Sequence, residues 1–99
     1  MDNVARNALI VYGHDYCGQA RALKKALTQH QVAHEWRDVL QGDARYRDEL
    51  KQLARGNLSV PTVIFPDGTV MVEPLTDAVL DYLKLREPSR LQQFMARWR

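Results

Sequence analysis

Cysteine is scarce in this sequence, since Cys17 is the only one among 99 residues. A single cysteine cannot form a disulfide within its own chain. Because free thiols persist in reducing compartments, this cysteine usage predicts a protein of the cytoplasm.

Long hydrophobic runs are also absent, although hydrophobic residues make up 45% of the chain. No apolar stretch approaches the ~20 residues that a membrane-spanning helix needs. The first seven residues are polar, and the apolar run at 8–12 is too short for the core of a secretion signal. We therefore expect no signal peptide and no membrane partner.

The charge of the chain has little excess of either sign, with a formal net charge of +2. Residues 84–99 hold five of the 14 basic residues and only one acid, Glu87, whereas the preceding residues hold 9 basic and 11 acidic side chains. No aromatic residue alternates with a basic stripe in that main part. We therefore expect no nucleic-acid partner.

The hydrophobic pattern predicts an α/β fold with the element order βαβαββα, without internal repeats. The first two strands, joined by a helix, must be parallel, and the last two flank the turn Pro66-Asp67-Gly68 as an antiparallel hairpin. The predicted sheet is therefore four-stranded and mixed, with helices on its faces. We predict strands at 8–13, 32–39, 61–65 and 69–72, and helices at 18–30, 43–56 and 76–83.

Helix signals support these boundaries. Asp43 is a suitable N-cap for the second helix, and Gly56 is a plausible stop after it. Helical spacing predicts two apolar faces that pack on the sheet, made of Ala20, Leu23 and Leu27 in the first helix and Tyr46, Leu50 and Leu53 in the second.

The end of the chain is predicted to form a separate amphipathic helix, which gives a domain at 1–86 and an extension at 87–99. Its apolar face consists of Leu91, Phe94, Met95 and Trp98. Because exposed apolar patches are avoided, we expect this face to fold back on its own domain, which favours a monomer. The alternative is that it docks a partner or a second subunit.

Cys17 lies after the loop that follows the first predicted strand, at the start of the first predicted helix. A free cysteine is often only a small buried hydrophobe. However, unpaired N–H groups and the helix dipole stabilise a negative sulfur at a helix N-terminus, and a thiolate is the nucleophile of thiol–disulfide exchange. His14 could add positive charge when protonated, and Asp15 would oppose it. This position predicts a nucleophilic Cys17.

A metal site is the competing hypothesis for this loop, since His14 and Cys17 could share a metal ion. A closed zinc site needs four ligands, and only two are in evidence. We therefore predict no metal.

Two motifs together resemble the glutaredoxin branch of the thioredoxin superfamily: VYGHDYCGQA at 11–20 and GNLSVPTVIFPDGTVMVEP at 56–74. The second motif is most similar to actinobacterial glutaredoxin-like proteins and mycoredoxins. The resemblance covers residues 8 to about 85 and implies a thioredoxin fold. It also implies a catalytic Cys17 and a cis-proline at Pro61. Substrate-binding roles are implied for His14, Tyr16, Gly18, Gln52, Val60, Pro61, Thr76 and Asp77.

Three positions depart from the family pattern. His14 replaces a lysine, Glu73-Pro74 replaces the Gly-Gly pair of glutathione-using members, and Ala20 replaces the second cysteine of Cys-x-x-Cys. The resemblance therefore implies a monothiol oxidoreductase that reduces mixed disulfides between proteins and a low-molecular-weight thiol, such as glutathione or mycothiol.

Two alternatives remain open. Some single-cysteine relatives hold a [2Fe-2S] cluster between two subunits, usually with the motif Cys-Gly-Phe-Ser, of which this chain has only the first half. The other alternative is a redox-inactive binding or adaptor domain that has kept the fold.

Overall fold

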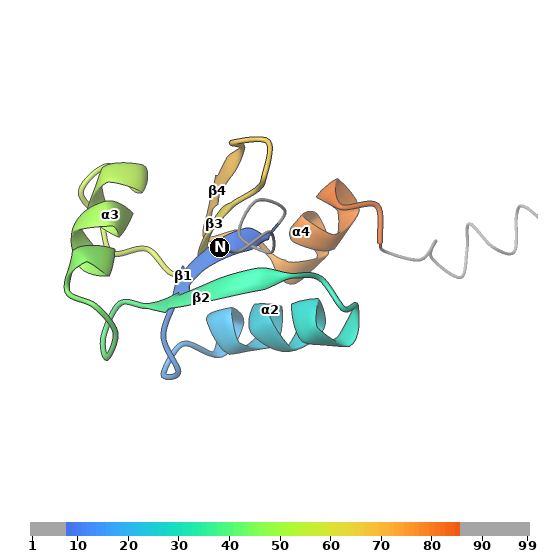
Figure 1. The fold of residues 1–99 in the computed structure, drawn as a ribbon, viewed down its shortest axis with the longest axis horizontal. Helices are drawn as coiled ribbons and strands as arrows, with labels where there is room; N and C mark the ends of the chain where they lie inside the picture. The colour runs from blue at the N-terminus through green and yellow to red at the C-terminus, as the bar shows by residue number, and fades with distance from the viewer. Residues whose placement is uncertain (1–7, 86–99) are drawn as a thin grey trace, which may run out of the picture.

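The computed structural model describes residues 8–85, which form a four-stranded sheet and three helices (Figure 1). The strands are β1 (Leu9–Gly13), β2 (His34–Asp38), β3 (Thr62–Ile64) and β4 (Val70–Val72). The helices are α2 (Gly18–Gln29), α3 (Arg45–Leu53) and α4 (Thr76–Tyr82). The predicted order βαβαββα is therefore confirmed, while the predicted 87–99 extension lies outside the described residues.

The sheet has the strand order β2-β1-β3-β4. β1 runs parallel to β2 and antiparallel to β3, and β3 forms an antiparallel hairpin with β4. The sheet is therefore mixed, as predicted. The central strand β1 carries the loop that leads to Cys17, so the carboxyl end of a buried strand positions the candidate nucleophile.

The two faces of the sheet bury different sets of side chains. Alternate residues of β1 supply Leu9 and Val11 to one face, where Leu23 and Leu27 of α2 and Val79 of α4 pack. On the other face, Tyr12 packs with Leu50 of α3 and with Ala54, the residue that follows this helix. Helices α2 and α4 thus cover one face of the sheet, and α3 covers the other. The predicted apolar faces of α2 and α3 both lie against the sheet.

Most predicted boundaries differ from the observed ones by one or two residues, because the ends of the predicted segments fall in turns. The clearest correction concerns Asp43, which is not the N-cap of α3. Ala44 occupies that position, and the Asp43 carboxylate instead accepts the Arg45 N–H at 2.9 Å. Gly56 ends the segment as predicted, with a φ of 89° and its N–H donated to the Lys51 carbonyl oxygen.

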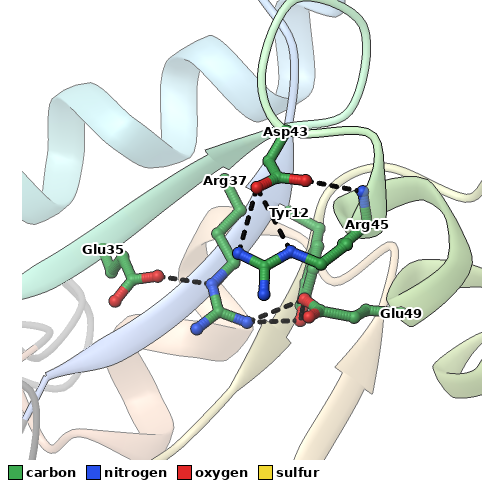
Figure 2. A network of polar contacts seen from close by, with 6 residues as sticks. All are labelled: Tyr12, Glu35, Arg37, Asp43, Arg45 and Glu49. Atoms are coloured by element: carbon green, nitrogen blue, oxygen red, sulfur yellow. Dashed lines mark hydrogen bonds and ion pairs between the residues drawn. The ribbon is translucent and has the colours of Figure 1, made fainter.

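A polar cluster of Tyr12, Arg37 and Glu49 joins the sheet to α3 (Figure 2). The Tyr12 hydroxyl donates to Glu49 Oε1 at 2.7 Å, and Arg37 Nη1 donates to both partners at 2.8 and 2.9 Å. Burial and the hydrogen bond to Glu49 raise the pKa of Tyr12 to about 12. Arg37 also binds Glu35, and these bonds outweigh burial to raise its pKa.

Within residues 8–85, no helix is long and apolar enough to cross a membrane.

Candidate active site around Cys17

Cys17 is the N-cap of α2, with an extended backbone at φ −98° and ψ 113°. Its Sγ accepts a hydrogen bond from the Ala20 N–H at 3.5 Å, which is one of the N–H groups that a helix start leaves unpaired. The first turn of α2 contains no acidic residue. The backbone therefore presents a donor and the positive end of the helix dipole to the sulfur, as expected for a thiolate nucleophile.

The opposite wall of the site is the turn that enters β3. The Val60–Pro61 peptide bond is cis, and the Cys17 thiol donates to the Val60 carbonyl oxygen at 3.7 Å. The sulfur therefore contacts one backbone acceptor and one backbone donor. Val60 is half-buried and Pro61 is buried. The thiol therefore lies between the N-terminus of α2 and the Val60–Pro61 turn.

The loop before Cys17 is held by His14. The His14 Nδ1 accepts the Tyr16 N–H at 3.2 Å, and the His14 carbonyl oxygen accepts the Cys17 N–H at 3.3 Å. His14 therefore shapes the loop through both its ring nitrogen and its backbone carbonyl. Tyr16 points outward and is 78% exposed.

Gln19 links α2 to the loop before α4. Its side-chain amide donates to the Pro74 carbonyl oxygen at 2.8 Å and to the Glu73 carbonyl oxygen at 3.4 Å. Glu73 has a positive φ of 50°, and its N–H donates to the Pro61 carbonyl oxygen at 2.8 Å. Contacts therefore run from Cys17 through the Val60–Pro61 turn to Glu73 and return through Gln19. Sequence reasoning missed this role of Gln19.

The other predicted binding residues are more dispersed. Gly18 is exposed, and an added Cβ there would meet no atom within 4 Å. Thr76 and Asp77 open α4 as predicted, directly after the segment that Gln19 holds. Gln52 is an exposed residue of α3, the helix on the opposite face of the sheet from α2. The binding roles of these residues stay predictions.

A pocket of about 460 Å³ lies between the end of α3 and β4. Its lining includes Ser59, which precedes Val60, and also Glu73, so the pocket adjoins the turn that faces Cys17. Arg55 and Asn57 supply polar groups to it, and Gln52 does not line it.

Metal-binding groups do not cluster in the described part of the chain. Among residues 8–85, no three His, Cys, Asp or Glu side chains are placed so that they could hold a metal ion.

The comparisons with known proteins identify the family to which the chain belongs. The glutaredoxin family model matches residues 9–71, which include the helix-capping cysteine and the Val60–Pro61 turn. The chain belongs to the glutaredoxin family. Glutaredoxins are generally thiol–disulfide oxidoreductases that use a low-molecular-weight thiol as co-substrate.

Similar glutaredoxins occur in Mycobacterium tuberculosis. Two proteins with that family name, from strains CDC 1551 and H37Rv, are each 35% identical over 72 residues. The matched segment covers 73% of this chain and 84% of each relative. The crystal structure of a single-residue mutant of a thioredoxin-like protein superposes with a TM-score of 0.68 at 28% identity. It covers 79% of this chain and 96% of the other, which confirms the predicted thioredoxin-like fold.

Proposed function

We propose that this glutaredoxin is a monothiol oxidoreductase that reduces mixed disulfides between proteins and a low-molecular-weight thiol. The observation that carries the proposal is the position of Cys17, at the N-cap of α2 with the Ala20 N–H directed at its sulfur. Because the chain has no second cysteine, the reaction must use one protein thiol and small thiols from solution.

The first step is an attack by the Cys17 thiolate on the small-thiol sulfur of a mixed disulfide. A bond forms between Cys17 Sγ and that sulfur, and the bond to the substrate sulfur breaks. The substrate leaves as a thiolate and takes a proton from water. The Ala20 N–H donates to the attacking sulfur, and the Val60 carbonyl oxygen loses its contact with the thiol when the new sulfur–sulfur bond forms.

The second step regenerates the enzyme. A second small thiolate attacks the small-thiol sulfur bound to Cys17, so that the two small thiols leave as their disulfide and Cys17 leaves as a thiolate. The same N–H group that favours attack also stabilises the leaving sulfur. The cycle consumes reduced small thiol, so we place the protein in a reducing compartment such as the cytoplasm.

Recognition of the small thiol is assigned by the family resemblance. We propose that the Val60 backbone pairs with the peptide-like part of the thiol, beside Pro61, and that Gln52 and the backbone of Thr76 and Asp77 bind its carboxylates. Tyr16 and Leu75 are 78% and 71% exposed, and they give the site an apolar rim for the protein substrate. Glu73 places a carboxylate where glutathione-using relatives have glycine.

Intact-mass spectrometry tests the proposal. We expect oxidised glutathione, mycothiol disulfide or bacillithiol disulfide to add one small-thiol mass to the reduced protein, and excess reduced thiol to remove it. Cys17→Ser should add none and should keep the fold, because serine is itself a favourable N-cap. If all three disulfides leave Cys17 unmodified, the exchange mechanism is wrong.

A further inference from the structure

A groove of about 640 Å³ runs along the solvent-exposed side of α2 and begins at Asp15 and Gly18, the residues two positions before and one after Cys17. Gly18 and Ala22 lie on one side of the helix, one turn apart, and leave a shallow floor because they have little or no side chain. Arg21 and Lys25 line the same groove. The groove therefore continues from the candidate nucleophile along the first turns of the helix.

The groove is strongly basic. Arg21 and Lys25 are exposed, and the Lys24 ammonium is held 4.5 Å from the centroid of the Trp36 ring. Among the lining residues Asp15 is the only acid, and it lies at the Cys17 end. Positive charge therefore increases away from the thiol, over the second and third turns of the helix.

We propose that this α2 groove binds an acidic segment of the protein substrate, next to the cysteine that carries the small thiol. This inference rests on the proposed function and names the class of protein that the site prefers. Arg21 and Lys25 follow Cys17 by four and eight residues, which corresponds to about 6 and 12 Å along a helix axis. An extended chain covers that distance in about two to four residues. The acidic residues should therefore lie about two to four positions from the substrate cysteine.

Charge also distinguishes this occupant from two others. Residues 84–99 of the same chain are predominantly basic, so their charge would be repelled by Arg21 and Lys25. Nucleic acid would be attracted to the same cations, but none of the residues that line the groove is aromatic, so bases have no ring to stack on. An acidic peptide satisfies the charge and needs no stacking.

Binding without chemistry gives the first test. Three labelled peptides have serine in place of the substrate cysteine: one carries Glu two and four positions away on both sides, one carries Gln there, and one carries the same Glu residues eight or more positions away. Fluorescence anisotropy should show about fivefold tighter binding of the first peptide at low salt, the size expected from two exposed ion pairs. This preference should fall at 300 mM salt.

The groove variant is Arg21→Glu combined with Lys25→Glu. A matched control is Arg47→Glu combined with Lys51→Glu, which makes the same two charge changes at the same four-residue spacing on exposed positions of α3. The groove variant should lose the preference for the near-Glu peptide, and the control should keep it. The proposal would be overturned if the native protein bound the near-Glu and Gln peptides equally well. It would also be overturned if the groove variant and the control lost the preference for the near-Glu peptide to the same extent. Tighter binding of a single-stranded DNA oligonucleotide than of the near-Glu peptide would do the same.

A reaction arm separates this proposal from the proposed function. The same peptides, with cysteine as a mixed disulfide with 2-mercaptoethanol, are mixed with reduced protein, and transfer of mercaptoethanol to Cys17 is followed by mass. The near-Glu peptide should react about fivefold faster than the Gln peptide. Hydroxyethyl disulfide carries no charge and corrects for any change in the reactivity of Cys17 itself. The rate with the near-Glu peptide divided by the rate with hydroxyethyl disulfide should fall in the groove variant and stay constant in the control. If no disulfide reacts while the binding preference remains, the exchange mechanism fails and the acidic docking groove stands.

Discussion

The side chain of Gln19 donates a hydrogen bond to the Pro74 carbonyl oxygen at 2.8 Å, although the two residues are 55 positions apart. Gln19 lies in the first turn of α2, two residues after Cys17, and Pro74 lies just before α4. The bond therefore fixes the distance between the helix that carries the nucleophile and the loop that leads to the predicted carboxylate-binding turn.

We predict that Gln19→Ala slows thiol exchange about two- to tenfold and lowers the free energy of unfolding by about 1 kcal/mol. Loss of the amide frees the 73–75 loop, so the KM for the small thiol should rise more than kcat falls. Steady-state kinetics and urea unfolding measure both effects. Gln29→Ala, at the exposed end of the same helix, should change neither. An unchanged KM in Gln19→Ala would contradict a positioning role.

In the proposed mechanism the reaction uses one thiol, because Ala20 replaces the second cysteine of Cys-x-x-Cys. It is fully buried, and its N–H lies 3.5 Å from Cys17 Sγ, so Ala20→Cys would place a second sulfur near the first. Oxidised glutathione should then convert this variant to an internal disulfide, seen as a loss of 2 Da in intact mass relative to the reduced variant. This should allow the variant to reduce insulin disulfides. Ala22→Cys, at an exposed position, is the control and should give glutathione adducts instead.

Gly13 is required by the packing at the end of β1. A Cβ at this position would lie 2.6 Å from Cη2 of Trp36 and 3.1 Å from Cβ of Ala20. We predict that Gly13→Ala lowers the free energy of unfolding by about 1–3 kcal/mol, because the Trp36 ring must move. Gly18→Ala is the control, since open space surrounds that position and alanine favours helices. Urea unfolding that gives both variants the same stability would refute the steric argument.

Tyr12 makes stability depend on pH in the alkaline range. Its pKa is about 12 in the folded protein, against an ordinary value near 10. Between these values the folded state retains a proton that the unfolded chain has lost, so the stabilisation decreases as pH rises from about 10 to 12.

Tyr12→Phe removes this titration. The variant should be about 0.5–1.5 kcal/mol less stable than the native protein at pH 7. At pH 11 the titration should remove about 1 kcal/mol of this advantage from the native protein, so the gap should close or change sign. Urea unfolding at pH 7, 9.5 and 11 measures the gap. Tyr16→Phe, at an exposed position, should show no such trend. A stability gap for Tyr12→Phe that stays constant with pH would argue against a raised pKa of Tyr12.

The sequence predicted the fold because its periodic patterns are local. The apolar run before Gly13 and the spacing of Leu23 and Leu27 depend only on neighbouring residues, so they indicate a buried strand and an inward-facing helix before any tertiary contact is known. The N-terminal position of Cys17 on α2 follows from the same patterns. Boundaries were less certain, as at Asp43, because several polar residues near a helix start can accept its N–H groups.

The amino-acid sequence by itself determined the element order, the single thiol and its place between a strand and a helix, since these depend on residue type and spacing. Tertiary structure decided which distant backbone groups surround the thiol. The Val60 carbonyl oxygen and the Gln19 contact with Pro74 join segments that are 43 and 55 residues apart. Pairings of this kind depend on how the sheet brings its strand ends together, and no local pattern encodes that distance.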